Sequence, residues 1–80
     1  MIGVKVTTYK CDEPKECLEL LVLLIEELAN PDFPEKVNVL IGQTTDALTV
    51  YAIEPVGVKW DWGEGFKRFS PTTQHFLARF

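Results

Sequence analysis

The sequence is poor in the residues that build metal and nucleophile sites, since it holds one histidine and two cysteines in 80 residues. One imidazole and two thiols without ligand spacing do not make a tetrahedral zinc set, and the scattered carboxylates lack the alternation of a calcium loop. The "GEG" at 63–65 fits neither frame of a phosphate-binding glycine loop. We therefore expect no metal and no cofactor.

Long apolar runs are also missing. The longest covers six residues, Leu20 to Ile25, and glutamates flank it, whereas about 20 apolar residues are needed to cross a bilayer. The N-terminal "MIGVKVTTYK" has no continuous apolar region of a secretory signal. We therefore expect no membrane span and a cytoplasmic location, where Cys11 and Cys17 would stay thiols, with a disulfide between them as the alternative.

An excess of basic residues is the third absence. Eight bases against twelve acids give a net charge of −4, which argues against electrostatic attachment to nucleic acid or to anionic lipid. A hydrophobic content of 46% with 25% charged residues is typical of a globular chain. Residues 1–80 fit one domain and leave no room for a second core.

Alternation of apolar and polar residues predicts a strand at 2–9. The next segment, "KCDEPKE", has an early proline among acidic residues, which is typical of a helix N-terminus and predicts a helix over 13–29. The runs "KVNVLIG" and "ALTVYAIE", separated by "QTTD", predict a hairpin. The turn sequence "EPVG" precedes a predicted strand at 58–62. Ser70 and Pro71 suit the cap and the first turn of a short helix predicted at 71–79. The expected fold is α+β in the order β-α-β-β-β-α, a four-stranded mixed sheet with both helices on one face.

The long predicted helix is apolar over an arc of about 200°, wider than a surface helix usually needs. The remaining arc holds four glutamates with a leucine among them. Either this is a solvated face with one exposed leucine, or it is an acid-rimmed contact for another protein or a second copy. The residues of this acidic edge are Glu16, Glu19, Leu23, Glu26 and Glu27.

The segment "VKWDWGEGFKRF", 58–69, concentrates aromatic residues. In a strand its two tryptophans share one side, and that side either completes the core under the helix or forms an exposed aromatic and basic patch. An exposed patch would bind a protein or stack single-stranded nucleic acid. Its members are Trp60, Trp62, Phe66, Lys67 and Arg68.

The function predicted from these patterns is a non-enzymatic accessory or inhibitor-like protein that acts through contacts with another protein or with a second copy, as a homodimer. Its glutamates would imitate the charge of nucleic acid in a basic cleft. One alternative is a single-stranded nucleic-acid-binding module that uses 58–69. The other is an enzyme with Cys11 as nucleophile at a helix N-terminus and His75 as base.

Overall fold

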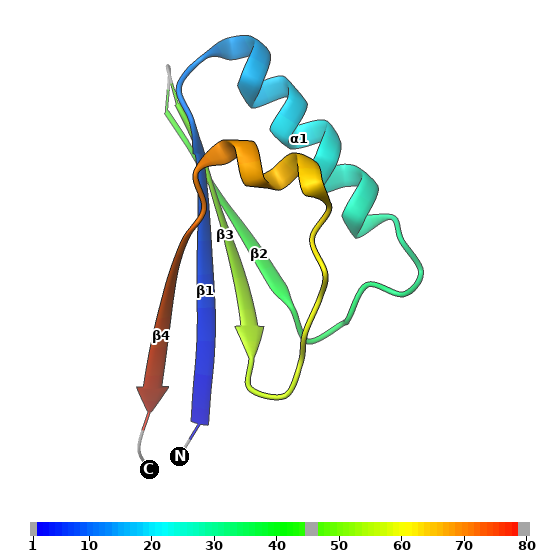
Figure 1. Ribbon diagram of the computed structural model, residues 1–80, viewed down its shortest axis with the longest axis vertical. Coiled ribbons are helices and arrows are strands. Elements are labelled where there is room, and N and C mark those ends of the chain that lie inside the picture. The colour runs from blue at the N-terminus through cyan, green and yellow to red at the C-terminus, as the bar shows by residue number, and fades with distance from the viewer. Residues whose placement is uncertain (1, 45–46, 79–80) are drawn as a thin grey trace.

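A ten-residue strand at the N-terminus, β1 (Ile2–Cys11), is the centre on which the other strands assemble. The computed structural model describes residues 2–44 and 47–78. Along the chain, β1 is followed by α1 (Pro14–Leu28), β2 (Asn38–Gln43), β3 (Leu48–Pro55), the 3-10 helix η1 (Glu64–Phe69) and β4 (Thr72–Ala78). The predicted α+β class, with one four-stranded sheet and two helices, is confirmed (Figure 1).

The strands lie in the order β2-β3-β1-β4, and every neighbouring pair is antiparallel. The expected mixed sheet is therefore wrong in its pairing. β1 and β2 do run in the same direction, as a crossover through a helix requires, but β3 lies between them and pairs with both. The hairpin of β2 and β3 forms as predicted, and part of its loop lies outside the described residues.

The last two elements stand in the reverse of the expected order, because the short helix precedes the final strand. Ser70 adopts the left-handed conformation (φ 49°), so it ends η1 and turns the chain back instead of capping a new helix. β4 then pairs with β1 over Thr72 to Ala78. The free edge of β1 favours strand here, and the β-branched threonines at 72 and 73 suit it.

Residues 58–62 form no strand. β3 ends at Pro55, and the chain leaves the sheet through a turn in which Gly57 has a positive φ (86°) and Val58 N–H donates to the Pro55 carbonyl. The edge of β1 on that side is occupied by β4. The segment therefore crosses from the end of β3 toward α1 and η1, as Figure 1 shows.

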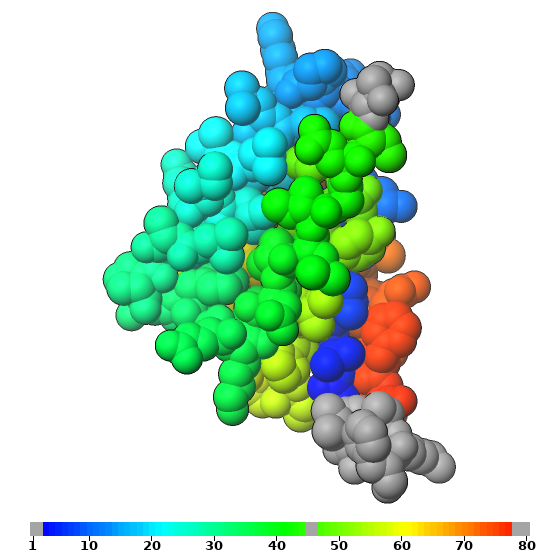
Figure 2. Space-filling model, turned by 180° about the vertical axis from the view of Figure 1, so that it is seen from behind, coloured from blue at the N-terminus to red at the C-terminus, as the bar shows by residue number. Residues whose placement is uncertain are grey.

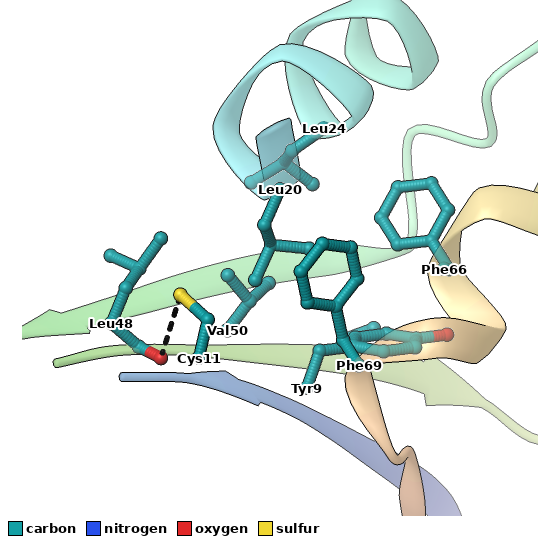
Figure 3. Packing of buried hydrophobic residues seen from close by; sticks show 9 residues of the cluster. Tyr9, Cys11, Leu20, Leu24, Leu48, Val50, Phe66 and Phe69 are labelled. Carbon is teal, nitrogen blue, oxygen red and sulfur yellow. Dashed lines mark hydrogen bonds between the residues drawn. The ribbon is translucent and has the colours of Figure 1, made fainter. Parts of the chain in front are cut away.

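One face of the sheet is covered and the other is open. α1 and η1 lie on the face that carries the odd-numbered residues of β1 and the even-numbered residues of β3 (Figure 1). Leu20 and Leu24 are the buried residues of α1, and they meet the two buried phenylalanines of η1 (Figure 3). The buried cluster consists of Tyr9, Cys11, Leu20, Leu24, Leu48, Val50, Ala52, Phe66 and Phe69.

The two cysteines are joined, which corrects the expectation of free thiols. Cys11 ends β1 and Cys17 lies in the first turns of α1, and their Cα atoms are 5.5 Å apart, an ordinary separation for a disulfide. The Cys11 sulfur also lies 3.8 Å from the Leu48 carbonyl oxygen, a contact that is a hydrogen bond only in the thiol form (Figure 3). The disulfide fixes the start of the helix against the sheet.

Replacement of Leu24 by alanine should destabilise the protein by about 2–5 kcal/mol, because it leaves a cavity where the helix meets the sheet. Leu18 lies in the same helix but is 64% exposed, so Leu18→Ala should change the free energy of unfolding by only about 0.5 kcal/mol. Urea unfolding followed by circular dichroism measures both. Equal losses would contradict the assigned orientation of α1.

Candidate functional site

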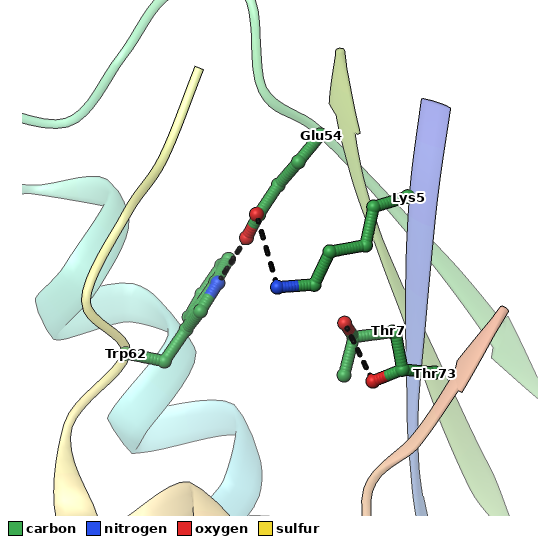
Figure 4. Close-up of polar contacts among 5 residues, drawn as sticks. All are labelled: Lys5, Thr7, Glu54, Trp62 and Thr73. Carbon is green, nitrogen blue, oxygen red and sulfur yellow. Dashed lines mark hydrogen bonds and ion pairs between the residues drawn. The ribbon is translucent and has the colours of Figure 1, made fainter. Parts of the chain in front are cut away.

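Both tryptophans of the 58–69 segment are turned toward the protein, and each is held by a glutamate. Trp60 Nε1 donates to Glu27 Oε2 at 2.9 Å. Trp62 Nε1 donates to Glu54 Oε1 at 2.7 Å, as Figure 4 shows. Phe33 meets both indoles edge-on, with ring centroids 5.3 and 5.7 Å away. The core interpretation of these rings is therefore the one that the geometry favours.

The second half of the segment is also engaged within the chain. Phe66 is a core residue, 2% exposed. Lys67 pairs with Glu64 at 3.1 Å, and Arg68 pairs with Glu19 of α1. Phe66 is therefore not part of an exposed aromatic and basic patch, and the two exposed cations face carboxylates of the same chain.

The acidic edge of α1 is the surface against which this segment packs. Leu23 is half-buried and contacts Gly65 so closely that a methyl group there would lie 3.0 Å from Leu23 Cδ1. Glu27 accepts hydrogen bonds from Trp60 and, at 3.1 Å, from the Gly63 amide. Three of the four glutamates, Glu16, Glu19 and Glu26, are exposed, and Glu19 forms an ion pair with Arg68.

Glu54 is a buried carboxylate that the sequence patterns did not single out. It is 3% exposed, accepts the Trp62 hydrogen bond and lies 3.7 Å from Lys5 Nζ (Figure 4). Glu54, Lys5 and His75 face one another across β3, β1 and β4. This row forms part of the wall of a cleft of about 580 Å³ between the sheet and residues 56–61. Strand pairing, which local patterns do not reveal, brings the three together.

Tyr9 is a core residue whose pKa is affected by burial and by the carboxylates of Glu54 and Glu27. Burial, reinforced by the negative charges of Glu54 and Glu27, raises the pKa of Tyr9 to about 12 from 10.0. Its ring contacts Phe66 and Trp62 with centroids 5.3 and 6.2 Å away. Tyr9 is therefore a neutral aromatic core residue throughout the physiological pH range.

The structure separates the two residues of the enzyme alternative. His75 faces Lys5, whereas Cys11 lies six residues further along β1, about 20 Å at the usual rise of a strand. Cys11 is also bonded to Cys17, so its sulfur is not a thiolate nucleophile in this state. No nucleophile and base pair arises from these two residues.

The even-numbered side of β1 lies on the uncovered face of the sheet, which we call the outer face. Residues that face one another across antiparallel strands share a side. Tyr51 therefore lies between Thr8 and Leu40, and Phe76 lies beside Val4. Lys10 is the one charged residue among the described side chains of this face. Figure 2 views the molecule from this side. Its apolar residues are Val4, Val6, Leu40, Tyr51, Ile53, Pro55 and Phe76.

A second apolar surface lies along α1. The wide apolar arc predicted for this helix is real, but the tryptophans do not cover it, because they pack on the opposite, acidic side. We call the uncovered stripe the helix flank. Its residues, all between 46% and 64% exposed, are Leu18, Val22, Ile25 and Leu28.

Comparison of the chain with protein-family models, curated proteins and solved structures found no significant match. Within the described residues, no helix has both the length and the apolar composition needed to cross a membrane. In the same part of the chain, no three His, Cys, Asp or Glu side chains gather where they could hold a metal ion. The two uncovered apolar surfaces are thus the features from which a function can be argued.

Replacement of Glu27 by alanine should destabilise the protein by about 1–3 kcal/mol, because the Trp60 indole and the Gly63 amide lose their acceptor. Its neighbour Glu26 is exposed, so Glu26→Ala should stay within about 0.5 kcal/mol of the unaltered protein. Urea unfolding gives the free energies, and a red shift of tryptophan emission in Glu27→Ala alone reports release of the rings. Similar behaviour of the two variants would contradict the assignment.

The free energy of unfolding should fall as the pH rises from 10.0 to about 12, because in this window the unfolded chain ionises a phenol that folded Tyr9 keeps protonated. Below this window the contribution of Tyr9 is complete and constant. Urea unfolding at a series of pH values should show a smaller fall for Tyr9→Phe than for Tyr51→Phe, which retains Tyr9. Equal slopes in the two variants would contradict the raised pKa.

Proposed function

We propose that this chain is a small non-enzymatic accessory or inhibitor-like protein that acts through protein–protein contacts, and that the outer face is its contact surface. The observation that carries the proposal is the composition of that face. Antiparallel sheets with one covered side usually turn polar residues to solvent. Here the open side presents aliphatic and aromatic residues in its middle rows, with Leu40 57% and Phe76 50% exposed.

The chemistry of the outer face suits a protein partner. Val4, Val6 and Ile53 are half-buried in its centre, so a flat apolar surface placed on them loses little side-chain entropy on binding. Tyr51 adds an aromatic residue with a hydroxyl group, a type enriched among residues that dominate binding energy. Threonines at 8, 49 and 72 provide an uncharged rim. We expect a partner that presents an apolar, uncharged surface of similar size.

Tyr51→Glu should abolish partner binding, because it places a charge at the centre of an apolar contact that must exclude water. The tagged protein and this variant are compared by affinity capture from the native cell, with quantification of every protein recovered. Lys59→Glu changes the charge of an exposed residue away from the outer face. It is the matched control and should recover the same proteins as the unaltered chain.

Thermal unfolding of both variants establishes that they are folded before capture. Recovery of the same proteins in the same amounts by Tyr51→Glu and by the unaltered chain would overturn the assignment of the outer face.

A further inference from the structure

β2 is an edge strand without the usual protection against pairing. It ends the order β2-β3-β1-β4, and within the described residues no strand pairs with its second edge. Natural edge strands carry charges, prolines or bulges that prevent association. Asn38–Gln43, with the sequence NVLIGQ, has no charge and no proline, and five of its six residues are exposed. Its free N–H and C=O groups can therefore accept another strand.

The helix flank lies on the same side of the molecule as this edge. Leu18 and Leu21 form the wall of a hollow of about 350 Å³ with Gln43 and Leu48, which places this side of α1 next to the β2–β3 hairpin. Figure 2 shows the helix residues, in cyan, beside green β2 and beyond the edge of the sheet. Ile41, on the covered side of β2, is 50% exposed, so the helix does not reach far enough to cover it.

We propose that a second copy of this chain docks on this edge, with the two β2 strands paired antiparallel about a two-fold axis. The pairing would join the sheets into one of eight strands and bring the two helix flanks together above the seam. One partner would thus form hydrogen bonds with the free backbone groups of β2 and also cover the apolar residues of the helix flank and Ile41.

A second copy is favoured over an unrelated strand because the surface is complementary to itself. A two-fold axis pairs a strand with its own copy, and facing residues of antiparallel strands share a side. An axis at Leu40 or at Ile41 therefore sets that residue against itself. Each chain has a net charge of −4, which opposes association, but the two β2 strands carry no charge and do not repel each other.

The two elements have matching lengths. Six strand residues extend about 20 Å at the usual rise, and the 15 residues of α1 extend about 22 Å. A contact of this length and about two elements in width is at the small end of specific interfaces. We therefore expect reversible association with a dissociation constant in the micromolar range.

Sedimentation of the purified protein from about 1 μM to 1 mM tests the proposal, with that range set by the expected affinity. The unaltered chain should change from monomer to dimer. Ile41→Lys and Ile25→Glu should each raise the dissociation constant at least tenfold, because each buries a charge at the seam. Leu77→Lys is the matched control, since Leu77 is 69% exposed on the opposite edge strand β4, and it should dimerise like the unaltered chain.

Hydrogen exchange provides a reading that does not depend on any variant. Amides of β2 should gain protection as the concentration of the unaltered chain rises. A monomer over the whole range, or a dimer that Ile41→Lys and Ile25→Glu leave intact, would overturn the proposal. Protection of β2 only by a different protein would also overturn it, in favour of strand addition by that protein. The outer-face experiment is unaffected by these results, because its variants lie on another surface.

Discussion

Two hydrogen bonds from tryptophan indoles to glutamates determine how this short chain completes its core. Trp60 donates to Glu27 of α1, and Trp62 donates to Glu54 of β3. Together they hold residues 58–63 between the helix and the sheet, and this placement brings η1, with Phe66 and Phe69, over Tyr9. A chain of this size buries only about 60% of the surface that its unfolded form exposes, less than a larger domain does, so the core depends on these large rings.

This arrangement makes the molecule asymmetric. The segment that carries the tryptophans covers the acidic side of α1, where Leu23 and Glu19 find partners. Nothing among the described residues covers the other side, so the helix flank and Ile41 stay exposed. The outer face is open because both helices lie on one side of the sheet.

Sequence patterns predicted β1 and α1 well, because the structure of these two elements depends mainly on residues close to one another in the chain. Alternation located β1, and an early proline with a long apolar repeat located α1 within one residue at each end. β4 was predicted as a helix because its strand character comes from pairing with β1, which local propensity does not contain. The difference between exposed Glu26 and hydrogen-bonded Glu27 depends on tertiary contacts in the same way, and so does the burial of Glu54 beside Lys5. The disulfide depends on tertiary structure too, because sequence spacing does not reveal that Cys11 and Cys17 meet.

Exchange of the two indole Nε1 protons with solvent, followed by nuclear magnetic resonance on the unaltered protein, tests the central claim most directly. If Glu27 and Glu54 hold the rings inward, both protons should exchange at least about tenfold more slowly than those of free tryptophan. The slow exchange of both protons should also be maintained until the protein unfolds as a whole. Exchange of either proton at the rate of free tryptophan would contradict the account.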